Sequence, residues 1–188
     1  RGNIGNPFPD YLMNIRNSFS FKGFELSALL DIREGGDIWC GTCARLNRLG
    51  RTELSADREK NYVIEGVIAD ANGESTGQAN NIEVSASDYF QGYLGDRGAA
   101  VEQAVFDGSW VRLRELTLNY AMDMSMFEKP IFKSLTLYVT GRNLWLSTDY
   151  PGVDPETSLT GSGSNVNGFD YFNNPGTKSW IFGLRAGF

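Results

Sequence analysis

The sequence predicts an all-β protein, a segment of an antiparallel transmembrane β-barrel with two long loops. Five segments alternate apolar and polar side chains, the pattern of strands with one apolar and one polar face. The connections between them are alternately short and long, as expected when all turns on one side of a membrane are short. The last segment carries an apolar side chain at almost every second position up to Phe188. Together these patterns favour a membrane barrel over a soluble sheet.

Composition argues against two other classes of protein. The 188 residues carry a formal net charge of −6, whereas a nucleic-acid-binding surface needs a basic stripe. The longest apolar runs are only a few residues long, far short of the roughly 20 residues of a helical membrane span. Strands that face lipid on one side remain compatible with this composition, because only alternate residues must be apolar.

The first two strands are expected to form a hairpin. Residues 11–21 and 24–33 both alternate, and Lys22-Gly23 between them has the composition of a tight turn. Its apolar face is predicted to comprise Tyr11, Met13, Ile15, Phe19, Phe21, Phe24, Leu26, Ala28, Leu30 and Ile32.

Residues 35–108 are expected to form one long, folded loop on the outer side of the barrel. A connection of this length is unusual in a compact domain but normal there. Residues 62–69 and 82–90 are apolar enough to be strands. An alternative is therefore that the loop contains three further wall strands, which would give a complete eight-stranded barrel.

Three more strands are predicted near residues 109–122, 134–146 and 179–188, with a second long outer loop at 147–178. The alternation changes phase near Arg114, which indicates a β-bulge or a strand end above the membrane. Bacterial barrels carry even numbers of strands from about 8 upward, so five strands cannot close. We expect the remaining strands to come from sequence outside this chain.

The two cysteines form the one reactive-looking motif, Cys40-Gly-Thr-Cys43. The chain has no His, and a metal site needs about four ligands. A redox role needs the first Cys at the start of a helix, whereas here we expect a strand followed by a loop. A loop disulfide and two free thiols both remain open.

Other loop and face residues are candidates for binding. Sugars and partner proteins cover exposed aromatic rings, although the same rings also pack on one another in loops. The candidate contact residues are Trp39, Tyr150, Phe169, Tyr171 and Phe172. Four arginines on the polar face, expected to face the lumen and a plug, are Arg16, Arg33, Arg142 and Arg185. Asp149, Asp154 and Glu156 are candidate ligands for Ca²⁺, and the alternative is that they are solvated acidic residues of a loop.

The final strand resembles the terminal signal that the outer-membrane barrel-assembly machinery recognises. Its outward side chains are predicted to be Trp180, Phe182, Leu184 and Phe188. The alternative is a buried edge strand of a soluble sheet that happens to end in Phe.

Longer stretches resemble one family. Residues 110–120 (WVRLRELTLNY) and 137–144 (LYVTGRNL) resemble consecutive late strands of SusC/RagA-type TonB-dependent transporters. Residues 148–156 (TDYPGVDPE) resemble the family's following loop, and residues 5–9 (GNPFP) and 35–38 (GGDI) fit upstream. The resemblance spans nearly the whole chain in the right order.

The resemblance implies that the chain is the C-terminal part of a 22-stranded barrel in the Gram-negative outer membrane, surrounded by lipid and lipopolysaccharide. The parent would contain a plug, pair with a SusD-like surface lipoprotein, draw energy from TonB and import oligosaccharides or peptides. No cofactor and no enzymatic activity are implied. The alternatives are a small outer-membrane barrel acting as an adhesin or anchor, and a soluble glycan-binding β-domain.

Overall fold

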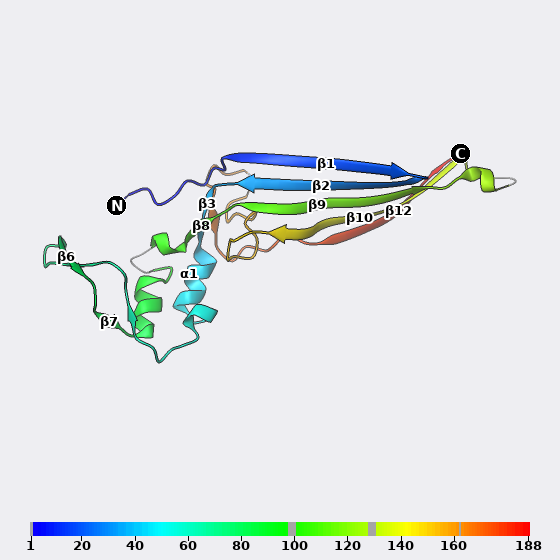
Figure 1. The fold of residues 1–188 in the computed structure, drawn as a ribbon. Coiled ribbons are helices and arrows are strands. Elements are labelled where there is room, and N and C mark those ends of the chain that lie inside the picture. Colours follow the sequence, from blue (N-terminus) through cyan, green and yellow to red (C-terminus); the bar gives the residue numbers. More distant parts are fainter. Residues whose placement is uncertain (1, 98–100, 128–130, 162) are drawn as a thin grey trace.

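The structure is a computed structural model that describes residues 2–97, 101–127, 131–161 and 163–188. Its main feature is a single antiparallel sheet of five long strands (Figure 1). In sheet order the strands are β1 (Tyr11–Phe21), β2 (Phe24–Glu34), β9 (Trp110–Ala121), β10 (Ser134–Ser147) and β12 (Ser179–Gly187). The expectation of five antiparallel strands is confirmed.

The β1–β2 hairpin closes through the two residues expected to turn. Lys22 and Gly23 both have positive φ, 45° and 84°. Two successive residues with positive φ are typical of the type I′ turn, whose twist matches that of the flanking strands. The turn sets Phe21 opposite Phe24, and this register continues to Tyr11 opposite Glu34.

The strand register gathers apolar side chains on one face of the sheet. One continuous row crosses all five strands and consists of Phe19, Leu26, Leu118, Val139 and Phe182. Apolar side chains on this face are largely exposed; Phe182 is 77% exposed. The row Ser18, Ser27, Thr117, Thr140 and Ile181 runs across the opposite face. The sheet therefore presents an apolar face and a mostly polar face rather than one side of a closed core.

Arg114 is a bulged residue in β9. The pairing of β9 with β2 passes from Glu115 directly to Leu113, and the pairing with β10 is interrupted at the same place. This confirms the bulge predicted from the phase change in the sequence. Because the bulge adds a residue without a partner, the side chain of Arg114 leaves the regular alternation of the strand.

The two long connections lie at one end of the sheet, and the short connections and the C-terminus lie at the other (Figure 1). A three-stranded sheet joins the long connections: β3 (Asp37–Cys40) pairs with β8 (Val105–Asp107) and with β11 (Phe169–Asp170). Helix α1 (Gly41–Arg48) follows β3 directly. A small buried cluster of Ile38, Cys40 and Tyr150 forms here, where the two connections meet.

The rest of the first long connection is built from short elements. Two separate two-stranded sheets pair β4 (Tyr62–Val63) with β7 (Glu83–Val84), and β5 (Val67–Ala69) with β6 (Ser75–Ala79). The single-turn helices are η1 (Glu53–Ser55), η2 (Asp88–Tyr93), η3 (Val101–Ala104) and, in the short connection after β9, η4 (Met124–Met126).

The alternative of three further wall strands is wrong. None of β4 to β7 joins the five-stranded sheet, and each is at most five residues long. The segment 82–90 contains two strand residues and then enters η2. In the described parts of the chain, no helix combines the length and apolar character needed to cross a membrane.

Candidate functional site

The candidate site lies at the junction of the two long connections. Parallel pairing of β11 with β3 sets Phe169 beside Trp39 and Asp170 beside Cys40. Four of the five aromatic residues singled out in the sequence therefore gather here, from segments about 130 residues apart. Trp39 meets Phe169 edge to face with ring centroids 6.0 Å apart, and Tyr171 meets Phe172 in the same way at 5.2 Å.

Gly41 permits the closest part of this arrangement. The rings of Trp39 and Tyr171 are nearly parallel, 6° apart, with centroids at 6.4 Å. A Cβ on Gly41 would lie 2.4 Å from the Tyr171 ring and 2.5 Å from the Trp39 ring. Residue 41 must therefore be glycine for the two rings to keep their positions.

A cleft of about 290 Å³ opens beside Trp39 and Phe169. Among the described residues of its lining, Asp37 is the one ionisable residue, and its Oδ2 atom already accepts a hydrogen bond from the backbone N–H of Asn6 at 2.7 Å. The cleft therefore offers mainly apolar and aromatic surface, typical of a site for a small apolar group or the face of a sugar ring. Its lining is Ile4, Gly5, Pro7, Asp37, Trp39, Val101, Val105, Asn167, Gly168 and Phe169.

Tyr150 does not share this surface. Its side chain is buried, and its hydroxyl donates a hydrogen bond to Asp170 Oδ2 at 2.9 Å. Burial raises the pKa of Tyr150, and the hydrogen bond to Asp170 and that residue's charge act in the same direction. Tyr150 therefore stays protonated and serves as a core residue; its prediction as a contact residue is corrected.

Cys40 and Cys43 form a disulfide, with their Cα atoms 5.2 Å apart. The expectation that Cys40 leads into a loop is wrong, because α1 begins at the next residue. Cys40 is the N-cap of this helix, and its sulfur accepts a hydrogen bond from the backbone N–H of Cys43 at 3.1 Å. The disulfide therefore closes the first turn of α1, and Cys40, which is completely buried, lies beside Asp170 of the second connection.

Asp170 was not singled out by the sequence. Its side chain is 1% exposed and accepts hydrogen bonds from Tyr150 and from the Thr42 hydroxyl, the latter at 3.3 Å. Nothing in the local sequence marks this aspartate, because its partners come from two other segments, residues 40–42 and Tyr150. Only the β3–β11 pairing brings them together.

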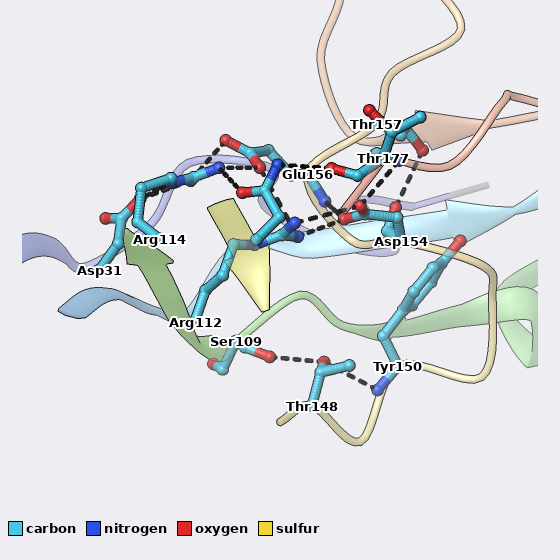
Figure 2. A network of polar contacts seen from close by, with 12 residues as sticks. Asp31, Ser109, Arg112, Arg114, Thr148, Tyr150, Asp154, Glu156, Thr157 and Thr177 are labelled. Carbon is cyan, nitrogen blue, oxygen red and sulfur yellow. Dashed lines mark hydrogen bonds and ion pairs between the residues drawn. The ribbon is translucent and has the colours of Figure 1, made fainter. Parts of the chain in front are cut away.

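A second polar cluster, which we call the latch, joins the second long connection to the first residues of β9 (Figure 2). It consists of Asp31, Arg112, Arg114, Asp154 and Glu156. Arg112 binds both carboxylate oxygens of Asp154, at 2.6 and 3.3 Å, and the two side chains are 4% and 6% exposed. Arg114, placed by the bulge, joins Asp31 to Glu156.

Further contacts surround the latch. The guanidinium carbons of Arg112 and Arg114 lie 5.2 and 5.5 Å from the centre of the Trp110 ring, within cation–π distance. Burial acts to raise the pKa of Asp154. The hydrogen bonds from Arg112 and from the N–H groups of Glu156 and Gly176, together with the charge of Arg112, outweigh burial and hold that pKa below its usual value.

The calcium hypothesis finds no support. Asp154 and Glu156 are occupied by arginines, whose charges would repel a cation. Among the described residues, no group of three acidic, Cys or His side chains is arranged to hold a metal ion.

Three of the four arginines expected to face the lumen line a broad depression on the polar face of the sheet. Arg16 and Arg142 flank Glu115, with N–O distances of 3.6 and 3.4 Å, and Arg185 lies over the ring of Tyr138. Arg33 lies elsewhere. It sits at the end of β2 and donates hydrogen bonds to the carbonyls of Gly35 and Pro7, so its role is to hold the backbone there.

The terminal strand is not a buried edge strand. Trp180, Phe182, Leu184 and Phe188 are between 59% and 79% exposed. A soluble sheet would cover such a surface with other parts of its own core. The exposed row instead continues the apolar face of the other four strands.

Comparison with known proteins decides the family. No family model matches the sequence. TonB-dependent receptor P3 of Formosa agariphila is 28% identical over 189 residues, which cover 98% of this chain and 17% of the relative. TonB-dependent receptor P26 of the same organism is 27% identical, over 98% of this chain and 18% of the relative. The chain is part of a TonB-dependent receptor. It spans under a fifth of the length of these curated relatives.

Solved structures agree with this assignment at the level of the fold. A chain of the RagAB peptide importer in its open-open state superposes with a TM-score of 0.60 and 18% identity, over 96% of this chain and 17% of the importer chain. The closed-closed state gives a TM-score of 0.55 and 16% identity, over 91% and 17%. The receptor segment therefore has the fold of part of the RagAB barrel, as the resemblance in the sequence indicated.

Proposed function

We propose that the chain forms part of the wall of a TonB-dependent importer in the Gram-negative outer membrane, and that it has no enzymatic activity of its own. The observation that carries this proposal is the two-faced sheet, with exposed apolar rows on one side and a charged depression on the other. Lipid would cover the apolar face, and the polar face would line the lumen and contact a plug.

The open edges of the sheet support a larger barrel. Within the described residues, β1 and β12 each pair with one strand only. An unpaired edge in lipid costs several kcal/mol for each unsatisfied backbone group. Further strands of the receptor would satisfy these edges, and by resemblance to SusC/RagA transporters we propose a total of 22. We propose that the exposed apolar row of β12 is recognised by the barrel-assembly machinery.

The two long connections would then lie outside the cell, with the Trp39 cleft at the barrel mouth. Substrates are proposed to be peptides or oligosaccharides, and Trp39, Phe169, Tyr171 and Phe172 to contact the substrate or a SusD-like lipoprotein. Support comes from the gathered rings and from the relatives: the RagAB structures are of a peptide importer. TonB would act through parts of the receptor outside this chain.

Uptake by living cells tests the proposal. We expect deletion of the receptor gene to abolish uptake of either a labelled peptide pool or a labelled oligosaccharide pool, and a protonophore to have the same effect, since TonB draws on the proton gradient. Trp39→Ala should lower uptake several-fold, while Val166→Ala, an exposed change in the second connection, should not. Unchanged uptake of both pools after deletion would contradict an import function.

The partner is tested separately. After mild detergent extraction, the tagged receptor should copurify with a SusD-like lipoprotein in stoichiometric amount. Recovery of the receptor alone from cells that import normally would contradict the proposed partnership and leave the import function standing.

A further inference from the structure

We infer that a second pocket, at the C-terminal end of α1, binds the carboxylate group of a ligand. This pocket, here called the Arg58 pocket, has a volume of about 260 Å³, enough for one sugar ring or one or two amino-acid residues. It lies within the first long connection, between the end of α1 and η2. Neither the latch nor the cluster around Trp39 contributes to it.

The charge of the pocket is the first argument. Its lining contains two guanidinium groups, from Arg48 and Arg58, and no carboxylate. Arg48 and Arg45 share the single carboxylate of Asp96, at 3.7 and 3.1 Å. Among the described residues Arg58 forms no ion pair, so the lining carries a guanidinium group that no carboxylate contacts. The described lining is therefore positively charged, in a chain whose net charge is −6.

The orientation of Arg58 is the second argument. Its Nη2 atom donates a hydrogen bond to the carbonyl of Gly50 at 3.0 Å, which holds one end of the guanidinium beside the pocket. Arginine carries five N–H donors, so several remain for a ligand. A guanidinium that is already held at one end loses less side-chain entropy when a carboxylate binds to it in a bidentate manner.

The neutral lining is the third argument. Phe90, 6% exposed, forms an apolar wall and is held in place by edge-to-face contacts with Tyr62 and Tyr89, at 5.3 and 5.2 Å. Asn47, Ser87 and Gln91 add amide and hydroxyl groups. An apolar wall, a few polar groups and a fixed cation are the usual composition of a small-ligand site.

The carboxylate has two candidate sources, a peptide C-terminus and an acidic sugar. Calorimetry on the full-length receptor in detergent micelles distinguishes them. One arm compares an N-acetylated tripeptide bearing a free C-terminal carboxylate with its C-terminal amide. The other compares a trisaccharide of galacturonic acid with its methyl ester.

We expect one acidic probe to bind at least 10-fold more tightly than its neutral counterpart. Arg58→Gln should remove that difference, and Arg58→Lys should retain part of it. Arg51→Gln is the matched control, because it deletes an exposed positive charge in the same segment outside the pocket, and it should change affinity less than twofold.

Two results would overturn the inference: no preference for the acid form in either arm, or equal losses in Arg58→Gln and Arg51→Gln. Binding is measured on the purified receptor and not through uptake by cells. A failure of carboxylate binding is therefore distinguishable from a failure of the proposed import function. Arg58 is exposed, so the variant is expected to fold, and an unchanged melting temperature verifies this.

Discussion

The latch makes one strong quantitative prediction, for the substitution Asp154→Asn. The change keeps the size of the side chain and removes its charge, so Arg112, only 4% exposed, loses its bidentate partner. Breaking a buried ion pair by removing one member costs about 3–5 kcal/mol. Glu156 remains 3.6 Å from Arg112 and offsets part of this loss. We therefore expect a destabilisation at the lower end of this range, about 3 kcal/mol.

Hydrogen–deuterium exchange measures this cost directly. The backbone N–H groups of Glu156 and Gly176 donate to Asp154, at 3.0 and 3.2 Å, and exchange only when the latch opens. A loss of about 3 kcal/mol corresponds to roughly 100-fold faster exchange. Mass spectrometry of peptides covering residues 153–177, from the full receptor in micelles, gives the rates.

Glu156→Gln is the control, because it removes the same charge from a side chain that is 45% exposed. Ion pairs at such positions contribute about 0–1 kcal/mol, so exchange should accelerate less than about fivefold. The reasoning is refuted if both variants accelerate exchange equally, or if Asp154→Asn leaves it unchanged.

Four further outcomes are expected. Leu137→Arg on the apolar face should destabilise the folded receptor in lipid by about 2–4 kcal/mol, measured by urea titration, whereas Thr136→Arg on the other face should cost much less. Cys43→Ser should lower the free energy of local unfolding of α1 by roughly 2 kcal/mol, measured as faster proteolysis of residues 41–48. A reductant should have the same effect on the receptor without the substitution. Gly41→Ala should separate the two rings that flank it and quench or shift tryptophan fluorescence. The pKa of Asp154 is lowered in the folded state, so the latch stabilises the receptor fully above the usual carboxyl pKa of about 4. This stabilisation is lost as pH falls through the lower pKa of the folded state. After correction for intrinsic rates, hydrogen exchange at Gly176 should therefore accelerate only in that acidic range.

The sequence by itself determined the five long strands, their two faces and the bulge. These features depend on local alternation: a period of two fixes which side chains share a face, and the phase change near Arg114 marks the inserted residue. The Lys22-Gly23 turn fixed the register of the first hairpin in the same local way. The resemblance in residues 110–120 and 137–144 came from these same well-patterned strands.

The tertiary structure decided everything that depends on contacts between distant segments. Pairing of β11 with β3 buried Tyr150, made Asp170 a core residue and gathered the remaining aromatic side chains around Gly41. Closure of the second connection onto β9 turned Asp154 from a candidate calcium ligand into the partner of Arg112. Long loops have no regular alternation of apolar and polar residues. Their polar groups pair with residues about 40 to 130 positions away in the sequence, and no local pattern predicts such pairs.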